Sequence, residues 1–167
     1  YEEARQVPGI KHCFIGSGIR YDLCLSDTGN KEVDKTNRRY LETVIRHHVS
    51  GRFKVAPEHC SPTVLGLMRK PAFGLFQQLK SIFDEINRKH RLNEQIIPYF
   101  ISSHPGCRPE DMAKLAVATK TLDFKLEQVQ DFTPTPMTVA TTIYYSGYPP
   151  YSLQKIDTAK SEKEKKQ

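Results

Sequence analysis

The sequence has no long run of apolar residues. Its apolar stretches are short, and the one at residues 96–101 is interrupted by Pro98, whereas a membrane-spanning helix needs about 20 apolar residues in succession. Residues 1–16 also lack the basic and then apolar pattern of a secretory leader. We therefore expect a protein that neither spans a membrane nor carries a leader at this end.

Cysteine is scarce and irregularly placed. The four cysteines, at positions 13, 24, 60 and 107, match neither the spacing of a zinc-binding pair nor that of a thioredoxin-type pair. They are also too few for a small domain that is held together by disulfides. The pattern indicates reduced thiols in a cytoplasmic protein, and it predicts no metal site.

Basic residues are in excess, but they form no recognisable motif. The chain has 25 Lys and Arg against 19 Asp and Glu, which gives a net charge of +6. The last thirteen residues hold five lysines and three acidic residues, and so contribute +2 (5 − 3). Because the other basic residues are scattered, we expect a solvated surface with at most weak contact with RNA phosphates.

Short β-branched or aromatic runs alternate with longer amphipathic ones. Strands are expected at residues 11–16, 52–56, 95–102 and 125–132. Helices are expected at residues 30–50, from the Ser61-Pro62 pair, after Pro71, and from Pro109. The connections are long enough for parallel crossovers, so the sequence predicts an α/β fold of about four parallel βα units.

Two regions differ in composition. Residues 1–147 hold the alternating pattern, and four βα units are too few to close a barrel, so we expect an open arc or part of a larger sheet. Residues 148–167 become polar and charged. We expect this second region to be a flexible tail.

Polar stretches follow the expected end of each strand, at residues 17–22, 56–59, 102–106 and 131–136. Ligands of parallel α/β folds bind beyond the carboxyl ends of the strands. We therefore expect the four stretches to lie on one rim and to line a common binding site.

These stretches also have purely structural explanations, which stay open. Arg20 can form a surface ion pair with Asp22, and a residue such as Glu58 at a strand end can cap the next helix. The turn at residues 104–106 has ordinary proline and glycine chemistry. The His47-His48 pair lies within an expected helix, and we interpret it as solvated.

Five segments resemble the YgiQ family of radical S-adenosylmethionine (SAM) proteins. They are SGIRYD (17–22), KVAPEH (54–59) with LGLMRKP (65–71), IPYFISSHPG (97–106), QVQDFTPTP (128–136) and TTIYYSG (141–147). They occur in that family's order and cover nearly everything from residue 11 to residue 147. The resemblance implies a partial TIM-like barrel of six βα units, in which residues 1–147 supply units three to six.

The resemblance also implies an iron–sulfur cofactor that this chain cannot hold alone. Radical SAM enzymes bind a 4Fe-4S cluster through a CxxxCxxC loop, bind SAM at its open iron, and form a 5′-deoxyadenosyl radical. This sequence contains neither a CxxxCxxC run nor the glycine-rich motif of the second strand. We therefore expect a fragment that needs the missing N-terminal part of the barrel and is inactive by itself, with an unknown substrate.

The resemblance assigns roles to residues on the rim. Those expected to lie at SAM are Ser17, Arg20, Glu58, His59, Ser103, His104 and Gly106. Those expected on the substrate side are Gln128, Gln130 and Thr133. Glu58 would accept hydrogen bonds from both ribose hydroxyls, and Gly106 would permit close approach of the adenine.

Two other functional classes stay open. One is a metal-dependent, hydrolase-like αβ domain in which Glu58, His59, His104 and Cys107 bind zinc, since these residue types are acceptable ligands. No spacing in the sequence supports that cluster. The other is a basic RNA-binding module, which the net charge suggests, although the sequence lacks an interleaved patch of aromatic and basic residues.

Overall fold

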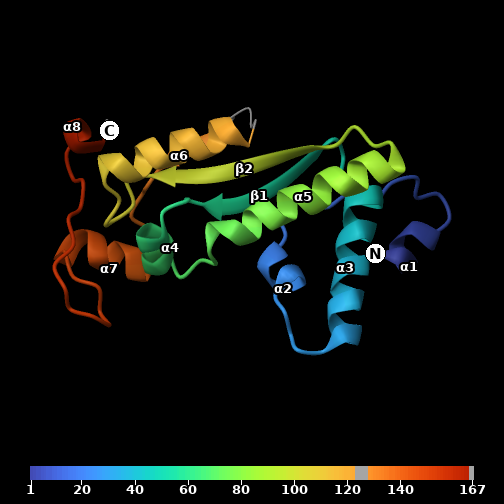
Figure 1. Cartoon of the computed structure of the whole chain (residues 1–167), viewed down its shortest axis with the longest axis horizontal. Helices are drawn as coiled ribbons and strands as arrows, with labels where there is room; N and C mark the ends of the chain where they lie inside the picture. The colour runs from blue at the N-terminus through green and yellow to red at the C-terminus, as the bar shows by residue number, and fades with distance from the viewer. Residues whose placement is uncertain (123–127, 166–167) are drawn as a thin grey trace. The chain divides into compact units, whose positions relative to one another are not determined.

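The computed structural model describes residues 1–122 and 128–165 (Figure 1). The strands are β1 (Arg52–Glu58), β2 (Gln95–Ser102) and β3 (Gln128–Asp131), and they form one sheet in the order β1-β2-β3. The helices are α1 (Glu2–Gln6), α2 (Tyr21–Leu25), α3 (Lys31–His47), α4 (Pro62–Met68), α5 (Phe73–His90), α6 (Pro109–Thr121), α7 (Val139–Ser146) and α8 (Glu162–Lys165). Helices interleave with a small parallel sheet, which confirms the predicted α/β class.

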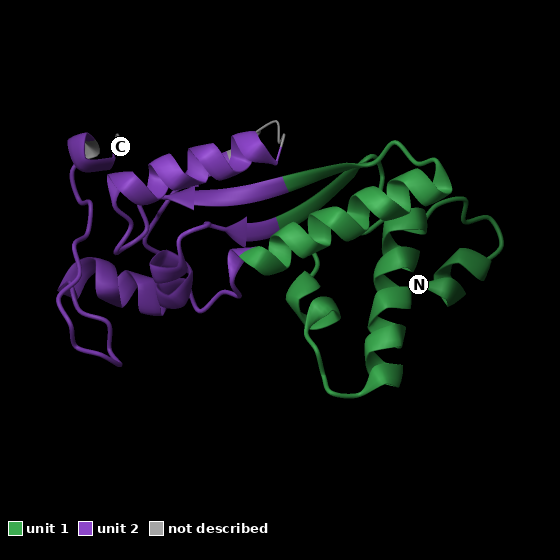
Figure 2. Ribbon diagram, viewed as in Figure 1, with its two compact units in different colours: residues 1–55, 74–97 green, residues 56–73, 98–167 purple. Residues whose placement is uncertain are grey.

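The chain divides into two compact units, each described by itself (Figure 2). Unit 1 consists of residues 1–55 and 74–97, and unit 2 of residues 56–73 and 98–167. In the part of the chain that the structure describes, no helix has the length and apolar character needed to cross a membrane.

Unit 1 is built on two amphipathic helices. Helix α3 begins after Asn30, as predicted, because the Asn30 side chain accepts a hydrogen bond from the backbone N–H of Glu32 at 3.0 Å. Leu41 on the apolar face of α3 is completely buried. In α5, Phe83 stacks on Phe53 of β1 with ring centroids 5.6 Å apart. These contacts form the core of unit 1.

Two predictions for unit 1 are wrong. Residues 11–16 do not form a strand, and the Ile15 backbone N–H instead donates to the His48 carbonyl at 2.9 Å. The described residues therefore hold three strands, because an extended run becomes a strand only where a neighbour continues the hydrogen-bond ladder. His48 is not solvated: its side chain is completely buried, with Nδ1 2.6 Å from the Cys13 carbonyl oxygen.

Unit 2 contains the parallel pairing of β2 with β3. The register runs from Tyr99 opposite Gln128 to Ser102 opposite Asp131. The Phe132 backbone N–H extends this pairing by donating to the Ser102 carbonyl at 2.9 Å. The predicted strand at residues 125–132 is thus formed at Gln128–Asp131, while residues 125–127 lie outside the described residues.

The last residues of the chain contact other parts of unit 2. The Ile156 backbone N–H donates to the Gly147 carbonyl at 2.8 Å, and the Gly106 N–H donates to the Asp157 carbonyl at 2.9 Å. The guanidinium of Arg69 lies 4.3 Å from the centroid of the Tyr151 ring. The division at residue 147 into a partial barrel and a flexible tail stays a prediction.

Candidate ligand-binding site

One pocket in unit 2 collects residues that follow the carboxyl ends of all three strands. This strand-end pocket has a volume of about 440 Å³. Glu58 is the last residue of β1, His104 comes shortly after β2, and Gln130 and Thr133 belong to β3 and the loop that follows it. Four of the predicted site residues therefore line the same pocket, which is the arrangement that parallel strands favour.

The charged part of the strand-end pocket is an ion pair between Glu58 and Lys70. The Lys70 Nζ lies 3.0 Å from Oε1 of Glu58, and the two side chains are 35% and 17% exposed. Glu58 does not cap the next helix, since Ser61 occupies the N-cap position of α4. The carboxylate is thus free of the structural role that the sequence left open for it.

His104 contributes a neutral ring to this pocket. Its side chain is buried, its Nδ1 lies 2.9 Å from the Pro105 carbonyl oxygen, and its ring meets that of Phe132 edge to face. Burial lowers the pKa of His104 below its usual value. Because a carbonyl oxygen only accepts, Nδ1 carries the proton in the neutral ring and Nε2 is left as an acceptor.

Left-handed backbone at residues other than glycine surrounds the same pocket. Glu58 (φ 67°) and Arg69 (φ 56°) line it, while Ser103 (φ 57°) precedes His104 and Met137 (φ 66°) precedes the lining residue Thr138. Each such residue costs about 1–3 kcal/mol, and such strain clusters at functional sites. No signal in the sequence predicted these conformations, because none of the four is glycine.

His59 lies apart from the lining of the strand-end pocket and pairs with Cys107. Its Nδ1 accepts a hydrogen bond from the Ser61 backbone N–H at 2.9 Å, so its Nε2 carries the proton and faces the Cys107 Sγ at 3.6 Å. Burial lowers the pKa of His59 and raises the pKa of the Cys107 thiol to about 11. The pair is therefore uncharged at neutral pH and lacks the thiolate that a nucleophile requires.

The zinc hypothesis finds no support in the geometry. Within residues 1–122 and 128–165, no group of three or more His, Cys, Asp or Glu side chains is arranged to hold a metal ion.

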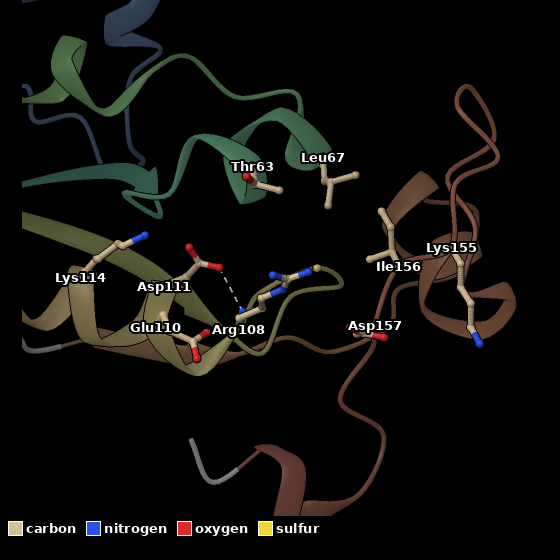
Figure 3. A pocket seen from close by; sticks show the side chains of 10 residues that line it. Thr63, Leu67, Arg108, Glu110, Asp111, Lys114, Lys155, Ile156 and Asp157 are labelled. Atoms are coloured by element: carbon tan, nitrogen blue, oxygen red, sulfur yellow. Dashed lines mark hydrogen bonds between the residues drawn. The ribbon is translucent and has the colours of Figure 1, made fainter.

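Gly106 borders a second cavity of unit 2, of about 500 Å³, whose walls include Thr63, Leu67, Arg108 and Ile156 (Figure 3). Gly106 has φ +81°, and a Cβ added to it would lie 2.5 Å from Leu67 Cδ1 and 3.2 Å from Ile156 Cγ2. The space beside Gly106 is thus filled by two apolar side chains of the chain itself. The role of Gly106 beside an adenine stays a prediction.

The remaining predicted site residues are placed as follows. In unit 1, Ser17 is exposed and lines a cavity of about 270 Å³. Arg20 pairs with Asp22, whose Oδ1 lies 2.8 Å from the arginine Nε, and this lowers the pKa of that carboxyl. In unit 2, Ser103 is buried and Gln128 begins β3.

Sequence reasoning missed Lys70 as a member of the site, whereas Asp131 lies in the polar stretch at residues 131–136 that was expected on the rim. Lys70 lies within the LGLMRKP run, and Asp131 accepts a hydrogen bond from the Ser102 hydroxyl across the paired strands. Both line the strand-end pocket. The available signal was Lys70 itself, a basic residue just after the helix that follows Glu58. A nearby positive charge stabilises an ionised carboxylate.

Substitution of Gly106 tests the packing of the second cavity. Gly106→Ala is expected to lower the free energy of unfolding by roughly 2–4 kcal/mol, because it adds left-handed strain and a clash with Leu67. Gly147→Ala is the control: it has φ +78° but an open position, with the nearest atom 3.7 Å away, and is expected to cost about 1–2 kcal/mol. Urea unfolding of both variants measures this, and equal losses would contradict the packing role.

Acidification is expected to destabilise the protein through its buried histidines. The pKa of His104 is lowered in the folded state, so the unfolded chain binds the proton first as the pH falls. Stability is therefore full above about pH 6.5 and is lost as the pH falls toward the folded pKa. Urea midpoints between pH 7.5 and 5.5 measure the slope. His104→Gln should flatten this pH dependence in part, with His59 and His47, whose pKa values burial also lowers, supplying the remainder. An unchanged slope in this variant would refute the assignment.

Comparisons with known proteins find one matching domain family and several proteins of similar sequence. Residues 127–166 match a domain family described as a domain of unknown function, DUF3362. The chain is 58% identical to a UPF0313 protein of Bacteroides thetaiotaomicron over 99% of this chain and 27% of the relative. It is 59% identical to one of Porphyromonas gingivalis (95% and 25%) and 45% identical to one of Methanocella arvoryzae (98% and 26%).

The chain spans about a quarter of the length of these relatives. These relatives support the YgiQ part of the resemblance found in the sequence, while its radical SAM part stays a prediction. The chain is homologous to proteins named UPF0313, which correspond to the YgiQ family.

Proposed function

We propose that this chain forms part of a radical SAM enzyme and that its strand-end pocket takes the adenosyl part of SAM. The observation that carries the proposal is the convergence of three strand ends on one pocket of about 440 Å³, two of whose lining residues, Glu58 and Arg69, have left-handed backbone. The segments that resemble the YgiQ family provide the same residues, among them Glu58 in KVAPEH and His104 in IPYFISSHPG. The volume of the strand-end pocket is in the range of small-molecule sites.

The lining of the pocket suits a nucleoside. Ile101, Phe132 and Val139 offer apolar surface for a base, and the Glu58 carboxylate can accept hydrogen bonds from ribose hydroxyls. The hydroxyls of Thr133 and Thr135 add further hydrogen-bonding groups. Nine of the fifteen lining residues are polar or charged, so the pocket offers a nucleoside hydrogen-bonding groups as well as apolar surface.

The iron–sulfur cluster does not fit the cysteines of this chain. Its four cysteines are widely separated and form no CxxxCxxC run, and the Cys107 thiol keeps its proton because burial raises its pKa to about 11. We therefore place the cluster on another segment of a longer protein and regard this segment alone as inactive. When bound, SAM supplies the adenosyl group that starts hydrogen-atom abstraction in this class of enzyme.

The residues of this chain would bind and orient the cofactor. Glu58 would fix the ribose, and the neutral ring of His104 would offer an acceptor nitrogen without adding a charge. Phe132 is buried and would exclude water from that side of the ligand. Gln130 and Thr133 line the same pocket and are the candidates for the substrate end.

Substitution of Glu58 tests this function in the full-length protein that contains the segment. Glu58→Gln is expected to weaken binding of S-adenosylhomocysteine about 10-fold, or about 1.4 kcal/mol, because the charged acceptor for the hydroxyls is lost. Glu110→Gln, at an exposed position of α6, is the matched control and should leave affinity unchanged. Isothermal titration calorimetry measures both, and wild-type affinity in Glu58→Gln would reject the proposal.

A second candidate function, contact with single-stranded RNA, gains one observation from the structure. Tyr145 and Tyr151 are 69% and 70% exposed. The Arg69 guanidinium lies against the Tyr151 ring, and Lys160 Nζ donates to the Tyr145 carbonyl at 3.3 Å. Unit 2 thus brings together aromatic and basic side chains of the kind on which bases stack.

Binding of a labelled single-stranded RNA separates this function from charge alone. The double variant Tyr145→Ala, Tyr151→Ala should bind at least about 10-fold more weakly, since stacking contributes about 1–3 kcal/mol per base. Tyr40→Ala in unit 1 is the control. If the double variant still binds the RNA and deletion of residues 155–167 abolishes binding, the binding belongs to the charged tail instead.

A further inference from the structure

Lys70 is held in place by the end of helix α4. Arg69 adopts left-handed backbone there, its N–H donates to the Gly66 carbonyl at 3.1 Å, and the Lys70 N–H donates to the Leu65 carbonyl at 2.9 Å. These two bonds form a Schellman motif, which fixes the direction of the chain as it leaves a helix. The backbone of Lys70 is thus set before its side chain makes any contact.

The backbone of Glu58 is also fixed. This residue is the last of β1 and has φ 67°, a conformation that persists only where the surroundings impose it. The Lys70 Nζ lies 3.0 Å from Glu58 Oε1. Because both backbones are set in advance and both side chains are partly buried, this pair loses less entropy and is less screened than a surface pair.

Lys70 is also the cation that pairs with the Glu58 carboxylate. The neighbouring Arg69 guanidinium lies over the Tyr151 ring, and burial lowers the pKa of His104, which keeps that ring neutral. In the described part of the chain, Lys70 is the partner found for the Glu58 carboxylate, and the contact is made through Oε1. An ionised carboxyl group has about four acceptor positions, so most of them are left for a ligand.

We propose that Lys70 is a positioning residue, which holds Glu58 so that its carboxylate accepts hydrogen bonds from two hydroxyls on adjacent carbons of a ligand. This inference rests on the proposed function, because it identifies the ligand's diol with the ribose of an adenosyl group. Lys70 acts through Glu58. Its removal therefore affects the selection of hydroxyl-bearing ligands more than the affinity for the base.

The test is a competition measurement on the full-length protein that contains the segment. Adenosine and 2′,3′-dideoxyadenosine each displace labelled S-adenosylhomocysteine, and the ratio of their affinities reports recognition of the hydroxyls. The wild type is expected to prefer adenosine by at least about 10-fold. Lys70→Met should reduce the preference to about 2–3-fold, while Lys70→Arg should retain most of it.

Two further variants complete the design. Adding Lys70→Met to Glu58→Gln should cause no further loss, since residues that act as a unit are not additive. Lys114→Met, at an exposed position of α6, is the matched control and should keep the wild-type preference. Thermal unfolding of each variant checks that it is folded.

The outcomes separate the inference from the function on which it rests. A wild type that does not bind S-adenosylhomocysteine, or that does not distinguish the two nucleosides, overturns the proposed function. A wild type that prefers adenosine together with a folded Lys70→Met variant that keeps the full preference overturns the role of Lys70 alone. A loss in Lys70→Met that Lys70→Arg restores supports it.

Discussion

The parallel pairing of β2 with β3 is the interaction on which the strand-end pocket depends. It sets Ser102 opposite Asp131, and the Ser102 hydroxyl donates to the Asp131 carboxylate at the ends of the two strands. Because the strands run in the same direction, the segments that follow them leave from one edge. His104 and Thr133 reach the same pocket for this reason. A different register would turn alternate side chains to the other face of the sheet.

Much of the fold followed from local signals in the sequence. The apolar run of β2 was predicted with its observed bounds, and the starts of α3, α4 and α6 followed from Asn30, Ser61-Pro62 and Pro109. Capping residues and proline act within a few residues of chain, so one sequence is enough to find them. The prediction of a strand at residues 11–16 was wrong, because strand formation depends on a neighbouring strand that no local pattern reveals. The burial of His48 also depends on distant residues, namely Tyr1 and Cys13.

The candidate site was predicted in part. The rule that ligands bind at strand ends placed Glu58, His104 and Thr133 on one rim, and the family resemblance added Gln130. All four line one pocket in the structure. It missed Lys70, because that residue lies after a helix and reaches the pocket through left-handed backbone at Arg69. Strained conformations oppose local propensity, so sequence patterns do not predict them. The roles given to all ten predicted site residues stay predictions.

Hydrogen–deuterium exchange of the full-length protein, with and without S-adenosylhomocysteine, tests most directly whether the strand ends form one ligand site. A shared ligand site predicts slower exchange on ligand binding around Glu58 and at residues 68–70, 101–104 and 130–133, with little change in the second half of α6. Slower exchange confined to other parts of unit 2, with these four segments unchanged, would contradict it.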